Sequence, residues 1–166
     1  MAETSRRVAI ASDHAGVEMK RRLREALAEM GVEAEDLGPE SPESVDYPDF
    51  AAPVAERVSR GSADAGVLVC GTGLGMAMTA NKFPGVRAAV LYDDAAARLA
   101  RQHNDANVAV FGARTMSVED AIRRLRLFLE EPFEGGRHEK RIAKIQVIEK
   151  KNSTGRGPGP AGEGDR

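Results

Sequence analysis

The sequence contains one cysteine, few aromatic residues and no hydrophobic stretch of membrane-spanning length. Phe, Trp and Tyr make up 4% of its 166 residues. One cysteine excludes an internal disulfide framework and indicates a reducing compartment. A formal net charge of −2, with no basic run interleaved with aromatic residues, argues against a nucleic-acid-binding protein. The N-terminal residues lack the apolar core of a signal peptide. We therefore expect a soluble, cytoplasmic protein with neither a nucleic-acid nor a membrane partner.

The apolar and glycine patterns divide the chain into alternating strands and helices. Strands are predicted at residues 7–11, 32–37, 65–69, 86–91 and 108–111. Helices are predicted at 17–30, at 49–60, directly after a glycine turn at 71–75, from Asp93 or Asp94 to 102, at 117–130 and at 138–150. A chain of this length fits one domain with a sizeable core, which we expect over residues 1–151. Residues 152–166 have almost nothing to bury, so we expect a disordered Gly/Pro-rich tail there.

This alternation predicts an α/β fold, a Rossmann-like doubly wound parallel sheet of five strands with an extra C-terminal helix. Numbering the strands along the chain, we expect the spatial order 2-1-3-4-5, with right-handed crossovers. Ligands then bind in the crevice at the carboxyl ends of the first and third strands. We expect Asp13, His14, the segment 70–75, His103 and Arg114 to gather at this one edge of the sheet.

The segment 70–75 joins the third strand to a helix through three alternate glycines. Glycines let the backbone N–H groups approach a ligand closely, and the positive end of a helix favours an anion or a thiolate. A lone cysteine such as Cys70 is nevertheless more often a small buried hydrophobe. The turn lacks the Gly-Lys-Ser/Thr of a P-loop, and Met76 replaces the third glycine of a dinucleotide fingerprint. The turn therefore predicts an anion site without identifying the anion.

A thiolate base beside oriented N–H donors suits proton abstraction next to a carbonyl group, because the donors stabilise the charge that develops on oxygen. Guanidinium groups can hold a phosphate by forked hydrogen bonds, and an imidazole can move protons on and off a sugar hydroxyl. The candidates for these roles are Arg114, Arg137, Arg141, His14 and His103. Helix capping and a solvated helix face are the alternative explanations for them. The sequence contains no metal-ligand cluster, so we expect metal-free chemistry without a cofactor.

Several further motifs accompany the glycine turn in a fixed order. They are Ser12-Asp13-His14-Ala15-Gly16, Asp46-Tyr47-Pro48, Cys70-Gly71-Thr72-Gly73-Leu74-Gly75, Ala80-Asn81-Lys82, Arg101-Gln102-His103-Asn104-Asp105-Ala106-Asn107, Phe111-Gly112-Ala113-Arg114 and Gly135-Gly136-Arg137-His138. In these motifs the chain closely resembles the type B ribose-5-phosphate isomerases, relatives of the galactose-6-phosphate isomerase subunits. The resemblance is collinear over residues 7–150.

The resemblance implies interconversion of ribose 5-phosphate and ribulose 5-phosphate through a cis-enediolate. It assigns removal of the C2 proton to Cys70, assistance to Thr72 and ring opening to His103. The amides of Gly71, Thr72, Gly73, Leu74 and Gly75 are implied to hold the enediolate, Asp13 and Asn104 the hydroxyls, and His14, Arg114, Arg137 and Arg141 the phosphate. Some relatives use a Glu where this chain has Met76, so the cysteine version applies. The resemblance also implies a homodimer or a dimer of dimers, with sites at the subunit interface.

Two alternatives remain open at this point. The substrate of the isomerase is instead a hexose 6-phosphate, such as allose or galactose 6-phosphate, if the pocket is deep enough. The chain is otherwise a non-catalytic phosphosugar-binding module, although the joint presence of Cys70, Thr72 and His103 argues against this.

Overall fold

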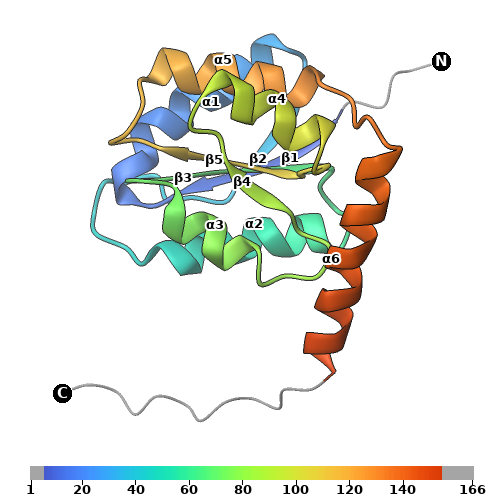
Figure 1. Ribbon diagram of the computed structural model, residues 1–166. Helices are drawn as coiled ribbons and strands as arrows, with labels where there is room; N and C mark the ends of the chain where they lie inside the picture. Colours follow the sequence, from blue (N-terminus) through green and yellow to red (C-terminus); the bar gives the residue numbers. More distant parts are fainter. Residues whose placement is uncertain (1–5, 155–166) are drawn as a thin grey trace. The chain divides into compact units, whose positions relative to one another are not determined.

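The computed structural model describes residues 6–154, and the chain divides into two compact units, Met1–Glu134 and Gly135–Arg166. The first unit contains a sheet with helices on both faces, and the second contains the helix α6 (Arg137–Ser153) (Figure 1). The single domain expected over residues 1–151 stays a prediction. The tail expected from residue 152 overlaps the end of α6, and residues 155–166 lie outside the described residues.

The first unit is built on a five-stranded sheet in which every neighbouring pair of strands is parallel. The strands are β1 (Arg7–Ser12), β2 (Glu33–Asp36), β3 (Ala65–Cys70), β4 (Ala88–Val90) and β5 (Val108–Gly112). This confirms the predicted fold class. The predicted order 2-1-3-4-5 is wrong in its last two positions, because the observed order is β2-β1-β3-β5-β4.

Burial explains why β4 and β5 exchange places. All five residues of β5 are buried, so this strand needs a neighbour on each side, and it pairs with both β3 and β4. By contrast, β4 has only three residues, all partly exposed, as is typical of an edge strand. The chain therefore crosses from β3 to β4, the outermost strand, and then returns to place β5 between β3 and β4.

Right-handed crossovers determine the face of the sheet on which each helix lies. The helices of the first unit are η1 (His14–Gly16, a single 3₁₀ turn), α1 (Val17–Glu29), α2 (Tyr47–Ser59), α3 (Leu74–Ala80), α4 (Asp94–Gln102) and α5 (Val118–Glu130). Connections toward β4 place α2 and α3 together on one face, while α1, α4 and α5 cover the other (Figure 1).

Alternating side chains of the strands supply two buried layers, one under each set of helices. Along β3, Val67 and Val69 belong to the layer that contains residues of α1, α4 and α5, whereas Leu68 and Cys70 belong to the layer that contains residues of α2 and α3. The period of two thus directs the Cys70 side chain toward α3, whose first residue lies four positions further along the chain.

The helix boundaries follow local capping chemistry. Asp93 accepts the Ala96 N–H at 2.6 Å and Ser117 Oγ accepts the Asp120 N–H at 3.1 Å, so each side chain caps the helix that it precedes. The helix predicted to begin at residue 49 begins instead at Tyr47, because a proline is tolerated in a first helical turn.

The second unit contains α6, which follows two glycines with positive φ and runs three residues beyond its predicted end. Arg137 and Arg141 lie four residues apart near its N-terminus, so they share a helix face. Within the described residues of both units, no helix is long and apolar enough to span a bilayer.

Candidate active site

Cys70 is the last residue of β3 and the first residue of the glycine turn. Its side chain is nearly buried, with 4% exposure, and Sγ accepts a hydrogen bond from the backbone N–H of Gly73 at 3.1 Å. Gly73 is the N-cap of α3 and has a φ of +83°, which glycine adopts readily. The turn therefore directs an amide N–H at the sulfur, an arrangement that stabilises negative charge there.

The loop after β5 holds the glycine turn in place from its other side. The backbone N–H of Ala113 donates to the Cys70 carbonyl at 2.8 Å, and that of Arg114 donates to the Gly71 carbonyl at 2.9 Å. The Arg114 guanidinium lies over Gly71, where an added Cβ would be 2.8 Å from Nη1. An exposed cation is thus brought to the carboxyl end of β3, as the sequence predicted.

Two of the five amides expected to hold the enediolate have acceptors within the turn itself. The Gly73 N–H donates to Cys70 Sγ, and the Leu74 N–H donates to Thr72 Oγ1 at 3.3 Å. Both Thr72 and Leu74 are exposed, so this part of the turn is open to a ligand. The long bond from Leu74 is weak compared with an ordinary N–H···O bond and can be exchanged for one to a substrate oxygen.

Asp13 and His14 lie at the carboxyl end of β1, the strand that pairs with β3. Asp13 is 7% exposed and Oδ1 accepts the Ala15 N–H at 2.9 Å, so it caps η1. His14 Nδ1 accepts the Val45 N–H at 3.2 Å, which leaves Nε2 as the nitrogen that carries the proton in a neutral ring. Asp13 also donates its backbone N–H to the Val69 carbonyl at 3.0 Å, next to Cys70.

Tyr47 completes this edge of the sheet and was not identified as a site residue from the sequence. A Cβ added to Gly75 would lie 2.6 Å from the Tyr47 ring, so the ring packs directly on the glycine turn while its side chain stays 41% exposed. Asp46-Tyr47-Pro48 is among the motifs shared with the type B isomerases, but the resemblance assigns Tyr47 no role. Only the glycine at position 75 leaves room for this contact.

A buried ion pair holds the start of the loop that leads from β2 to α2. Lys20 is 3% exposed, and Nζ donates to Asp36 Oδ1 at 2.8 Å and to the Pro39 carbonyl at 2.6 Å. Burial by itself raises the pKa of Asp36. Hydrogen bonds from Lys20 and the Gly38 N–H, with the charges of Lys20 and Arg24, outweigh burial and hold that pKa below its usual range.

His103 and Asn104 lie at the opposite edge of the sheet, so the predicted position of His103 beside Cys70 in the same chain is wrong. They follow α4, which returns the chain from the carboxyl end of β4 to the amino end of β5. Gly66 pairs with Val108 at that end and Cys70 pairs with Gly112 at the other. Four residues at ~3.3 Å each separate these pairs by about 13 Å within one chain.

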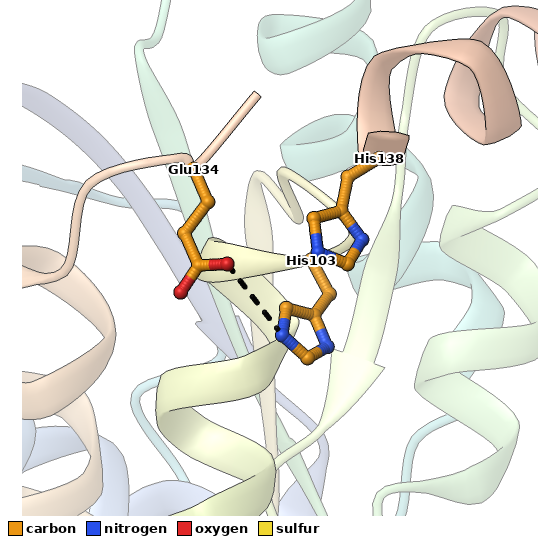
Figure 2. A group of neighbouring side chains, drawn as sticks. All are labelled: His103, Glu134 and His138. Atoms are coloured by element: carbon orange, nitrogen blue, oxygen red, sulfur yellow. Dashed lines mark ion pairs between the residues drawn. The ribbon is translucent and has the colours of Figure 1, made fainter. Parts of the chain in front are cut away.

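His103 has an acidic neighbour at this second edge (Figure 2). Its Nε2 lies 3.8 Å from Oε2 of Glu134, which is an ion pair when the imidazole is protonated. The Glu134 backbone N–H donates to the Gln102 carbonyl at 3.0 Å, so the acid is tied to the end of α4. His138, also drawn in Figure 2, belongs to the second unit together with Arg137 and Arg141. The expectation of metal-free, cofactor-free chemistry stays a prediction.

Known proteins resemble this chain along almost all of its described length. The family model described as Ribose/Galactose Isomerase matches residues 8–145. Ribose-5-phosphate isomerase B of Escherichia coli (strain K12) is 42% identical over 148 residues, which cover 89% of this chain and 99% of that protein. The chain therefore belongs to the ribose/galactose isomerase family.

Solved structures place the resemblance more narrowly within this family. Ribose-5-phosphate isomerase B of Clostridium thermocellum has a TM-score of 0.86 and 45% identity, covering 88% of this chain and 99% of that one. The Mycoplasma genitalium enzyme of the same name, with ribulose 5-phosphate bound, has a TM-score of 0.85 and 44% identity, covering 89% and 98%. Both are similar to this chain in fold and in sequence.

Proposed function

We propose that this protein is an aldose–ketose isomerase that interconverts D-ribose 5-phosphate and D-ribulose 5-phosphate through a cis-enediolate. The observation that carries the proposal is the contact between Cys70 Sγ and the Gly73 N–H, at a turn flanked by Asp13, His14 and Arg114. The M. genitalium relative has ribulose 5-phosphate bound, and the family's name describes this class of reaction.

The chemistry requires one base that moves a proton between neighbouring carbons. The Cys70 thiolate removes the C2 proton of the open-chain aldose, and the electron pair forms the C1–C2 double bond while charge moves to O1. Thr72 assists in moving the hydroxyl proton from O2 to O1. The Cys70 thiol then returns a proton to C1, which leaves the C2 ketone. Amide donors of the turn stabilise the enediolate oxygen, and removal of one such donor typically costs roughly 100- to 1,000-fold in rate.

The remaining residues bind the substrate. His14 and Arg114 hold the phosphate together with Arg137 and Arg141, whose guanidinium groups suit forked hydrogen bonds to phosphate oxygens. Asp13 and Asn104 hold the sugar hydroxyls, and His103 transfers the proton that opens the furanose ring. We further propose that residues 1–151 work as one isomerase domain in the cytoplasm, without a metal or a cofactor.

We propose that each site is completed by a second copy of the chain, as a homodimer or a dimer of dimers. Support comes from the separation of about 13 Å between the two edges of the sheet, which one imidazole cannot bridge from its own chain. In a two-fold symmetric dimer, His103 and Asn104 of the partner subunit reach the Cys70 turn, and the reverse holds for the other site.

Exposed apolar side chains on α3 and after β4 support this assembly. Leu74, Met78 and Tyr92 are 55%, 66% and 69% exposed, and Leu74 and Met78 are four apart on α3, on one helix face. Met78→Glu puts a charge on this face away from the reacting groups. We expect it to weaken the dimer and to lower activity as the protein is diluted, measured by sedimentation and by rate at several protein concentrations.

Incubation in deuterated water with each aldose phosphate tests the reaction. The expected result is conversion of ribose 5-phosphate with deuterium at the exchanged carbon of the product. Turnover of allose or galactose 6-phosphate but not of ribose 5-phosphate would assign a hexose substrate instead. Binding without turnover of any of the three sugars would favour a phosphosugar-binding module and overturn the proposal.

A further inference from the structure

Two arginines without a role in the proposed reaction form hydrogen bonds with the segment that follows His103 and Asn104. Arg87 Nε donates to the carbonyls of Asn104 and Asp105, at 3.0 Å each, and Nη2 donates to the Asp105 carbonyl at 2.8 Å and to its carboxylate at 3.1 Å. From the other side, Arg101 Nη1 donates to Asp105 Oδ1 and to the Ala106 carbonyl, both at 2.7 Å.

Asp105 has a backbone conformation that a glycine would adopt more readily. Its φ is +45°, and it is the one non-glycine residue with positive φ within residues 6–154. A glycine is sufficient to end a helix such as α4 in this conformation. The aspartate adds a carboxylate that both Arg87 and Arg101 hold, although its side chain is 36% exposed. A helix end alone does not require this carboxylate.

Both arginines are themselves held, so they form a rigid support. Arg87 and Arg101 are 19% and 17% exposed, and the guanidinium of Arg101 lies 5.8 Å from the centre of the Phe128 ring. The backbone N–H of Arg87 donates to Asn107 Oδ1 at 2.8 Å. The peptide groups after Asn104 and Asp105 are thus fixed, while the Asn104 side chain is exposed and the His103 side chain is 35% exposed.

We infer that Arg87, Arg101 and Asp105 are positioning residues for ring opening. They fix the His103–Asn104 segment so that it meets a cyclic sugar bound at the carboxyl ends of the strands in a partner subunit. This inference rests on the proposed function, because it assigns the ring-opening step to that segment. A misplacement of about 1 Å can cost roughly 100-fold in rate. Weakening the contacts that Arg87 and Arg101 make with this segment therefore slows ring opening without changing Cys70.

Two rates separate ring opening from proton transfer. Ribulose 5-phosphate cannot close a five-membered ring because its C5 oxygen carries the phosphate, so uptake of solvent deuterium into it needs Cys70 but no ring step. Conversion of cyclic ribose 5-phosphate needs both. The variants are Arg87→Lys and Asp105→Gly, and their matched controls are Arg7→Lys and Asp64→Asn, from an Arg–Asp fork where β1 begins.

We expect Arg87→Lys and Asp105→Gly to lower the conversion of ribose 5-phosphate about 10- to 100-fold. Deuterium uptake is measured at saturating ribulose 5-phosphate, where weaker binding of the hydroxyls by Asn104 has no effect on the rate, and it should stay within about twofold of the wild-type value. Both rates in the controls should also stay within about twofold, because exposed ion pairs contribute little. Equal losses in both rates, or full activity of Asp105→Gly, would show that these contacts stabilise the fold and do not position the segment for ring opening. If the wild-type protein catalyses neither process, the proposed function fails instead.

Discussion

Gly71→Ala tests whether the Arg114 guanidinium is part of the phosphate site. An added Cβ at position 71 would lie 2.8 Å from Nη1, 3.3 Å from Cζ and 3.4 Å from Cδ of Arg114. All three atoms belong to a flexible, exposed side chain, and Gly71 does not have positive φ. The guanidinium therefore has to move away from the turn, while the backbone stays in place.

The expected effect on binding is much larger than the effect on folding. A hydrogen bond to a charged group contributes about 1.5–3 kcal/mol, and about 1.4 kcal/mol corresponds to a tenfold change in affinity. We expect a tenfold or larger increase in KM for ribose 5-phosphate. The free energy of unfolding should stay unchanged or rise by about 0.4–1 kcal/mol, because alanine restricts the unfolded chain.

A double-mutant cycle isolates the contact. Steady-state kinetics and urea unfolding are measured for wild type, Gly71→Ala, Arg114→Ala and the double variant. Once Arg114 is truncated, the added methyl group has nothing to displace, so the two effects on KM should not add. Additive effects, or an unchanged KM in Gly71→Ala, would refute the idea that Arg114 binds phosphate from this position.

Three further outcomes follow from the site and its support. Cys70→Ala should abolish both isomerisation and deuterium exchange, with urea unfolding still cooperative; near-wild-type turnover would contradict its role as the base. His103→Asn should slow cyclic ribose 5-phosphate more than deuterium exchange into open-chain ribulose 5-phosphate, and equal losses would remove the ring-opening assignment. Lys20→Met should lower the free energy of unfolding at pH 7 by about 3 kcal/mol, the low end of the range for a broken buried pair. The folded pKa of Asp36 is lowered, so its stabilising contribution is present above about pH 4 and is lost as the pH falls through the folded value. The difference between Lys20→Met and wild type should therefore shrink in acid urea titrations, and a constant difference would contradict the stated cause.

Local features of the fold were predictable because they depend on neighbouring residues. Apolar runs, glycines and the caps at Asp93 and Ser117 determined the elements and most of their ends. The exchange of β4 and β5 was not predictable in this way. Both strands are short and apolar, and only the packing of the whole sheet decides which one is covered on both sides.

The candidate site was predictable in its glycine turn and not in its full composition. Cys70, Asp13, His14 and Arg114 follow the carboxyl ends of strands, so the parallel sheet brings them together. His103 precedes a strand, and α4 runs opposite to the strands, so the chain order itself assigns it to the other edge. One sequence also describes one chain, and it does not contain the arrangement of a second copy.

Subunit complementation tests the central claim, a site made from two chains, most directly. Cys70→Ala is expected to be inactive on ribose 5-phosphate, and His103→Asn to keep only a small fraction of the wild-type rate. When the two variants are unfolded, mixed in equal amounts and refolded together, random assembly gives about a quarter of the sites an intact Cys70 and an intact His103 of the partner subunit. We predict recovery of about a quarter of the wild-type isomerase activity in this mixture. No recovery, with mixed assemblies demonstrated by two different affinity tags, would mean that both residues act from the same chain and would contradict the account.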